Sequence, residues 1–285
     1  MANIDVTLRQ MGIGYACKKG AKSAPNQDDF CIIVDGNTSI FGVFDGHGLF
    51  GHLCSYTIQQ LLPKLLLGNP NYKQNLELAL KQSFAKVDEA LRGIAQQEGR
   101  FSVLLSGTTV TLLVYRDGDL YVAHVGDSRA VLCRLDKDGK QIAVPLTRDH
   151  SPSIPEENKR IEEMGGEVRK QDEYAPSRVF GRDANYPGLA MSRAIGDDIA
   201  KCFGVVADPE VNCFKIEKSD LFFIVASDGV WEFMENEKVV EMIHKNGKNK
   251  ADKSAGDVAE AAFTIWLSRE NNTTDDITCI IHYFN

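Results

Sequence analysis

Alternation of apolar and polar residues predicts a chain rich in β-strands. Apolar and β-branched runs, bounded by polar segments, occur at residues 29–34, 39–44, 108–115, 120–125, 130–134, 221–226 and 277–284. Asp-Gly dipeptides lie between runs of this kind, at Asp35-Gly36, Asp117-Gly118 and Asp138-Gly139. Because Asp-Gly is a strong signal of a tight hairpin, the pattern predicts antiparallel sheets.

Apolar residues at three- and four-residue spacing predict helices between the groups of strands. The longest such segment is 72–94, and 155–164, 236–244 and 254–268 follow the same pattern. The predicted class is therefore α+β, with antiparallel sheets covered by helices and not a parallel doubly wound sheet. No repeat or linker divides the chain, so we expect one domain over residues 1–285. The least regular segment, 169–188, is typical of a functional or mobile loop.

Composition limits the binding partners and the cellular compartment that we expect for the protein. The formal charge of −8 disfavours nucleic acid and anionic membranes, and no apolar run reaches membrane-spanning length. The seven cysteines form no C-x-x-C pair, so the sequence signals neither a disulfide framework nor a zinc-thiolate site. The N-terminus has no signal-peptide pattern. We expect a cytoplasmic or nuclear protein, and a monomer by default.

Aspartates at the ends of the predicted strands are the main candidates for chemistry. Asp28 and Asp275 precede strands, Asp45 and Asp228 follow strands, and Asp127 lies in a Gly-Asp-Ser turn. A single Asp beside Gly is usually a turn residue, but five together indicate a shared site. If the sheets bring them together, their mutual repulsion requires cations. All-oxygen ligands without cysteine favour Mg²⁺ or Mn²⁺ over zinc or copper.

Two further residues complete the predicted site. Gly46 lacks a side chain, so its carbonyl oxygen can approach a cation closely. Two bridged cations can lower the pKa of a shared water from about 15.7 towards about 7 and neutralise a phosphate. An expelled alkoxide then needs a proton donor, and His47 is placed for this role two residues after Asp45. The other histidines, at 52, 124, 150, 244 and 282, are predicted to be core or surface residues.

Seven segments of the chain resemble the metal-dependent protein serine/threonine phosphatases of the protein phosphatase 2C type, in the order found in that family. They are Asn26-Gln27-Asp28, Phe44-Asp45-Gly46-His47-Gly48, Ser106-Gly107-Thr108-Thr109, His124-Val125-Gly126-Asp127-Ser128-Arg129, the run from Leu189 to Asp197, Ala226-Ser227-Asp228-Gly229-Val230-Trp231, and Thr274-Asp275-Asp276-Ile277-Thr278.

This resemblance implies a four-layer αββα sandwich and a two-metal centre that acts on phosphorylated proteins. By resemblance, Asp45 is the bridging carboxylate, Gly46 a carbonyl ligand, and Asp228 and Asp275 are ligands of the second ion. Asp28 acts from the outer coordination sphere, Asp127 helps Asp228 to hold a weaker third ion, and His47 is the general acid. Residues 165–188 correspond to the variable flap beside the cleft. The implied cofactors are two Mg²⁺ or Mn²⁺ ions.

The chain departs from the family pattern at two places. The family usually has an arginine that grips the substrate phosphate, whereas this chain has Lys22, which is either a substitute point charge or an ordinary surface lysine. Glu232 stands where many members have aspartate, which affects the third ion. Two other functions remain open at this stage: a catalytically inactive scaffold, which typically loses metal carboxylates, and a hydrolase of small phosphorylated metabolites.

Overall fold

The hairpin signals mark real turns in the computed structural model, which describes residues 4–99, 101–173, 175–270 and 272–284. β5 (Val110–Arg116) and β6 (Asp119–Val125) are joined through Asp117 and Gly118, whose φ angles are 54° and 87°. Two successive positive φ values fit a turn that matches the twist of the flanking strands. The other two Asp-Gly dipeptides join β2 to β3 and β7 to β8.

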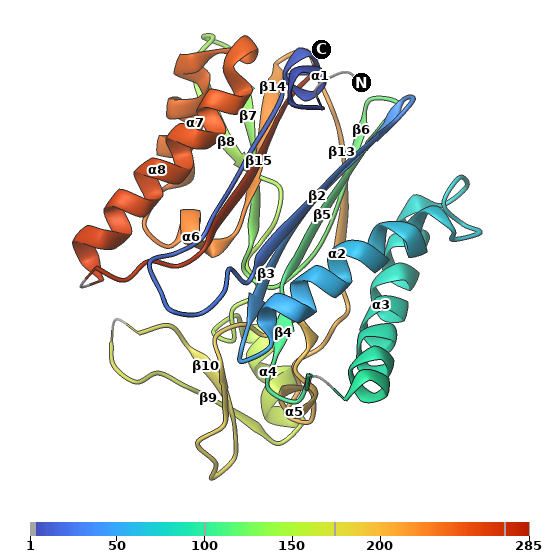
Figure 1. Ribbon diagram of the computed structural model, residues 1–285, viewed down its shortest axis with the longest axis vertical. Helices are drawn as coiled ribbons and strands as arrows, with labels where there is room; N and C mark the ends of the chain where they lie inside the picture. The colour runs from blue at the N-terminus through green and yellow to red at the C-terminus, as the bar shows by residue number, and fades with distance from the viewer. Residues whose placement is uncertain (1–3, 100, 174, 271, 285) are drawn as a thin grey trace.

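Two large antiparallel sheets pack face to face (Figure 1). The first sheet has the order β1 (Ile13–Lys18), β15 (Ile277–Tyr283), β14 (Asp220–Ala226), β7 (Arg129–Leu135) and β8 (Gln141–Pro145). The second has the order β12 (Ile195–Gly196), β4 (Gly107–Thr108), β3 (Thr38–His47), β5, β6 and β13 (Glu210–Lys215), and β2 (Asp28–Asp35) also pairs with β3. Buried residues from both sheets, including Phe41 and Phe223, form the central core.

A pair of helices covers the outer face of each sheet. α2 (Gly51–Leu67) and α3 (Leu76–Glu98) pack on the second sheet, and α7 (Asn236–Asn246) and α8 (Ala251–Arg269) pack on the first (Figure 1). Each helix pair shares its own buried apolar cluster with the sheet beneath it. The predicted four-layer αββα sandwich is therefore confirmed.

Some of the predicted boundaries were wrong. The helix predicted over 72–94 begins only at Leu76, because the Asn75 side chain caps it by accepting a hydrogen bond from the Leu78 N–H at 3.0 Å. It ends at Glu98, and the next residue, Gly99, adopts the left-handed conformation. α2 was not predicted at all. It contains Pro63 and has no side-chain cap at its start, and both features weaken the helix signal.

The segment predicted to be irregular contributes residues to three short strands. A three-stranded antiparallel sheet is formed by β9 (Gly166–Arg169), β10 (Arg178–Gly181) and β11 (Pro187–Leu189). α4 (Pro155–Glu163) and α5 (Asp198–Lys201) lie beside it, at one end of the sandwich (Figure 1). Residues such as Ile161, Val179 and Met191 give this unit a small apolar core of its own. The strands are too short for their periodicity to stand out in the sequence.

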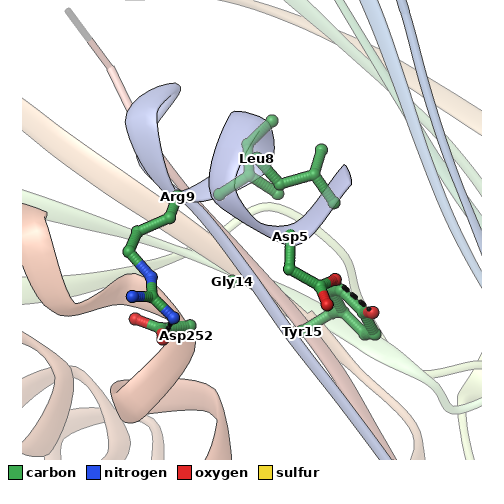
Figure 2. A pocket seen from close by; sticks show the side chains of 7 residues that line it. Asp5, Leu8, Arg9, Gly14, Tyr15 and Asp252 are labelled. Carbon is green, nitrogen blue, oxygen red and sulfur yellow. Dashed lines mark hydrogen bonds and ion pairs between the residues drawn. The ribbon is translucent and has the colours of Figure 1, made fainter. Parts of the chain in front are cut away.

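The N-terminal helix α1 (Ile4–Gln10) lies at the opposite end of the sandwich, over β1 and the start of α8. Arg9 forms an ion pair with Asp252 at 2.6 Å, and the Tyr15 hydroxyl donates a hydrogen bond to Asp5 at 3.0 Å (Figure 2). These contacts border a pocket of about 280 Å³. The remaining short helices are α6 (Asp228–Trp231) and the 3-10 turn η1 (Lys248–Lys250). Within the described residues, no helix combines the length and apolar character needed to cross a bilayer.

Candidate metal centre

Strand ends from both sheets bring the predicted carboxylates to one edge of the sandwich. Asp28 lies directly opposite Asp45 in the ladder between β2 and β3. Asp228 lies two positions after Ala226, the last residue of β14, and the hydroxyl of the intervening Ser227 donates a hydrogen bond to Asp28 at 2.8 Å. This bond ties the first sheet to the second. A cavity of about 500 Å³ opens here, and Asp127, Asp228 and Asp275 line it.

Burial and mutual repulsion raise the pKa values of the clustered carboxyl groups. Burial raises the pKa of Asp45 well above its ordinary value, and the charges of Asp228 and Asp28 raise it further. Burial also raises the pKa of Asp228 strongly, followed by the effects of Asp127 and Asp275. For Asp28, burial raises the pKa to about 7 against the opposing hydrogen bond from Ser227. Without cations, these carboxylates do not all stay ionised together near neutral pH.

Asp127 also has a raised pKa. Burial raises the pKa of Asp127 to about 6, and the charge of Asp149 adds to this effect. One buried oxygen of Asp127 and one of Asp228 have no hydrogen-bond partner within the described residues. Because buried polar atoms are normally paired, these two oxygens indicate a missing positive partner. The donor set fits a hard divalent cation, which prefers carboxylate and carbonyl oxygens.

The backbone at Gly46 leaves no room for a side chain. A Cβ atom there would lie 2.3 Å from the carbonyl oxygen of Gly51 and 2.7 Å from that of Gln27. The Gly46 N–H donates to the Gln27 carbonyl at 3.0 Å, which holds β3 against the loop before Asp28. The Asp45 N–H is similarly held by the Thr109 hydroxyl at 3.1 Å. The chain therefore keeps the Asp45-Gly46 backbone in a fixed position at the cluster.

His47 lies beside the carboxylates and is held by a residue to which the sequence analysis assigned no role. Its Nε2 atom is 2.6 Å from Oδ2 of Asp197, whose side chain is 4% exposed. Burial alone would lower the pKa of His47, but Asp197 and, more weakly, Asp127 raise it above its ordinary value. Asp197 was part of a matching segment, yet no strand pattern indicated that it would reach His47.

The Lys22 side chain is held beside the cluster by two carboxylates. Its ammonium group lies 2.6 Å from Asp275 and 2.9 Å from Asp276. Burial alone would lower the pKa of Lys22, but these two carboxylates raise it well above its ordinary value. Asp276, which is 2% exposed, also accepts hydrogen bonds from the backbone N–H groups of Gly20 and Gln27. This second residue without an assigned role therefore anchors the loop that carries Lys22.

Outside the aspartate cluster, His124, His150 and Glu210 form a group that could in geometric terms hold a metal ion. Its hydrogen bonds favour a structural role. The Gly126 N–H donates to Nδ1 of His150 at 3.1 Å, so the neutral ring carries its hydrogen on Nε2, which faces Glu210 at 3.6 Å. Burial and the stacked ring of His124 lower the pKa of His150 to about 2. Both histidines are buried, whereas the sequence predicted only that they are core or surface residues.

Comparisons with known proteins identify the family of the chain. The protein phosphatase 2C family model matches residues 22–276. The chain is 36% identical over 282 residues to probable protein phosphatase 2C 35 of Arabidopsis thaliana, covering 90% of this chain and 78% of that protein. It is 33% identical to probable protein phosphatase 2C 48 of rice, Oryza sativa subsp. japonica, covering 94% of this chain and 83% of that protein.

Solved structures support the same fold. The crystal structure of serine-threonine phosphatase 2C from Toxoplasma gondii aligns with a TM-score of 0.85 at 23% identity, covering 96% of this chain and 94% of that chain. A bacterial serine phosphatase aligns with a TM-score of 0.69 at 17% identity, covering 96% of this chain and 98% of that one. The chain belongs to the protein phosphatase 2C family of metal-dependent protein serine/threonine phosphatases.

Proposed function

We propose that the chain hydrolyses phosphoserine and phosphothreonine in proteins by direct attack of water at a centre of two Mg²⁺ or Mn²⁺ ions. The observation that carries this proposal is the convergence of Asp28, Asp45 and Asp228 from both sheets, with raised pKa values. When bound, the two cations supply an activated water and neutralise charge on the phosphate.

The proposed ligands are the residues that the backbone holds at the cluster. Asp45 would hold both ions, the Gly46 carbonyl would hold one of them, and Asp228 and Asp275 would hold the other. Asp28 would act from the outer coordination sphere, with one of its oxygens accepting a hydrogen bond from Ser227. Asp127 and Asp228 would hold a weaker third ion on the side of the cavity that Glu232 also lines. The unpartnered oxygens of Asp127 and Asp228 support this last assignment.

His47 is the proposed proton donor to the departing serine or threonine oxygen. A protonated imidazole suits this role, because the alkoxide is a strong base and Asp197 favours the charged ring. Lys22 supplies positive charge for the substrate phosphate near Asp275. A lysine there acts as a point charge, without the bidentate geometry of arginine.

An active protein phosphatase is favoured over the two alternatives that the sequence left open. Every proposed ligand position carries its oxygen group, which argues against a catalytically inactive scaffold. The curated relatives bear the names of protein phosphatases, which favours protein substrates over small metabolites. We further propose a monomer of the cytoplasm or nucleus that binds no nucleic acid, because the charge is −8 and the seven cysteines are free.

Two variants test the assigned roles. Asp228→Ala is expected to abolish metal-dependent turnover of both a phosphothreonine peptide and an aryl phosphate, because it removes a ligand. His47→Ala is expected to lose about 100-fold or more on the peptide and much less on the aryl phosphate, since a phenolate departs with little protonation. Unchanged turnover in Asp228→Ala would overturn the two-metal assignment. Equal losses on both substrates in His47→Ala would overturn the general-acid role.

A further inference from the structure

Three leucines next to His47 are exposed to solvent. Leu49, two residues after His47, is 78% exposed, and Leu104 and Leu105 in the loop before β4 are 53% and 49% exposed. A single exposed leucine on a protein surface needs no explanation. Three of them on adjoining loops beside a catalytic group do, because exposed apolar surface of this kind often marks a binding site.

Backbone pairing brings together the two loops that carry these leucines. In the ladder between β3 and β4, Gly46 lies opposite Thr108 and His47 lies opposite Gly107. The ladder ends at His47, and the chain turns at Gly48, whose φ angle is 79°. The two loops stay close beyond the ladder, since a Cβ on Gly48 would lie 2.1 Å from the Leu105 carbonyl oxygen.

Hydrogen bonds fix both loops and attach them to the residue that holds His47. The Phe50 N–H donates to the Ser106 hydroxyl at 3.0 Å. The Asp197 N–H donates to the Ser106 carbonyl at 3.1 Å, and the Ile199 N–H donates to the Leu104 carbonyl at 3.0 Å. The leucines therefore have a defined position relative to the imidazole of His47.

The loop that carries Leu104 and Leu105 is packed against the core, so these leucines are not exposed because the loop is loosely packed. The neighbouring Phe101 and Val103 are buried in the core beneath the second sheet, and the ring of Phe50 packs against that core. The same loop thus directs Phe101 and Val103 inward and leaves the consecutive Leu104 and Leu105 outside. The structure contains no described segment that covers them.

The chemistry at His47 identifies the occupant. A general acid must reach the oxygen that leaves with the serine or threonine, so the substrate chain has to pass beside His47. The cavity that Asp127 and Asp228 line contains charged residues such as Arg129 and aromatic residues such as Trp266. Leu49 lies two residues after His47, and Leu105 lies two residues before Gly107, the ladder partner of His47, so a substrate chain that passes His47 has exposed leucines beside it.

We propose that Leu49, Leu104 and Leu105 form a docking surface for apolar residues that flank the phosphorylated residue of the protein substrate. We refer to these three residues as the leucine rim. This inference rests on the proposed function, and it assigns a sequence preference to the substrate class. Burial of an apolar side chain against the rim gives binding energy that small aryl phosphates cannot use.

The test compares two phosphothreonine peptides of equal length and charge, one with leucine on both sides of the phosphothreonine and one with serine at both positions. The unmodified chain with Mn²⁺ is expected to favour the leucine peptide by about tenfold in kcat/KM, the scale of one well-placed apolar contact. The double variant Leu104→Ser/Leu105→Ser is expected to lose most of this preference and to keep its turnover of an aryl phosphate.

Leu78→Ser is the matched control, because Leu78 is also exposed, at 39%, but lies on α3 away from His47. It is expected to keep the full preference. Equal kcat/KM values for the two peptides in the unmodified chain, or a preference that survives in the double variant, would overturn the docking surface while leaving the proposed function intact. Absence of metal-dependent aryl phosphate turnover in the unmodified chain would overturn the proposed function, and this inference with it.

Discussion

The imidazole Nε2 of His47 lies 2.6 Å from Oδ2 of Asp197, and this contact joins the end of β3 to the start of α5. Gly107 makes the contact possible, since a Cβ there would lie 2.1 Å from the same Asp197 oxygen. Asp197 is therefore a positioning residue for His47. It sets the direction of the ring and favours its charged form.

Asp197→Asn keeps the size of the side chain and removes its charge. We expect turnover of a phosphothreonine peptide to fall by about 10- to 100-fold, with an aryl phosphate affected much less, because only the poorer leaving group depends on His47. Steady-state kinetics on both substrates measures this difference. The control is Asp198→Asn. It alters the hydrogen bond from Arg92 to Asp198, at 3.0 Å, and should leave the ratio of the two rates unchanged. A uniform loss on both substrates in Asp197→Asn would contradict the positioning role.

Gly46→Ala is expected to reduce both stability and activity. The new methyl group would overlap the Gly51 carbonyl at 2.3 Å, and overpacking of this kind costs about 1–3 kcal/mol. Thermal unfolding should show a Tm lowered by several degrees. Gly93→Ala in α3 is the control, because nothing lies within 4 Å of its Cβ position, and the substitution should raise stability by about 0.5–1 kcal/mol. A Gly46→Ala chain that is as stable and active as the unmodified one would show that the backbone there does not need glycine.

Lys22→Ala is expected to raise KM for phosphate esters by about fivefold or more, with a smaller effect on kcat, because it removes positive charge from the phosphate site. Lys22→Arg should retain most of the affinity. Lys218→Ala, which changes an exposed lysine between β13 and β14, controls for the loss of one positive charge. If KM in Lys22→Ala matches that of Lys218→Ala, the role of Lys22 is limited to its contacts with Asp275 and Asp276.

The lowered pKa of Glu157 predicts that this residue contributes to stability in a pH-dependent way. Burial alone would raise the pKa of Glu157, but hydrogen bonds from Arg160, Arg193 and Ser192 lower it far below its ordinary value. A carboxyl with a lowered pKa in the folded state stabilises the fold above its ordinary pKa of about 4.5, and the contribution declines as pH falls below that value.

Glu157→Gln should therefore destabilise the chain by about 3 kcal/mol at pH 7, because it leaves buried cationic groups without their partner. The difference in stability from the unmodified chain should shrink below about pH 4.5. Denaturant unfolding at several pH values measures it. The adjacent Glu156, which is exposed and pairs with Arg148, provides the control Glu156→Gln with little expected effect. A destabilisation that stays constant from pH 7 to pH 3 would contradict this account.

The sequence predicted the parts of the fold and site that depend on strong local patterns. Asp45 and Asp228 could be recognised because each comes at or just after the end of a long apolar run, and the hairpins could be recognised from their Asp-Gly turns. Asp197 and Asp276 could not be assigned, because their partners lie 150 and more than 250 residues away along the chain. A local sequence pattern cannot indicate a contact between residues so far apart in the chain.

The sequence also did not predict several strands, because their local patterns are weak. β8 and β13 lie at sheet edges and are only partly buried, so their apolar alternation is weak. The sheet of β9, β10 and β11 has strands of three or four residues, which is too short for a period to be recognised. Tertiary packing, and not local propensity, orders these segments.

The dependence of phosphothreonine hydrolysis on divalent cations tests the central claim most directly. Purified protein should release phosphate from a phosphothreonine peptide with Mn²⁺ or Mg²⁺, lose this activity when a chelator removes the metal, and regain it when the metal returns. Turnover that continues undiminished in chelator, or no turnover with either metal by a chain shown to be folded, would contradict the two-metal centre at Asp45 and Asp228.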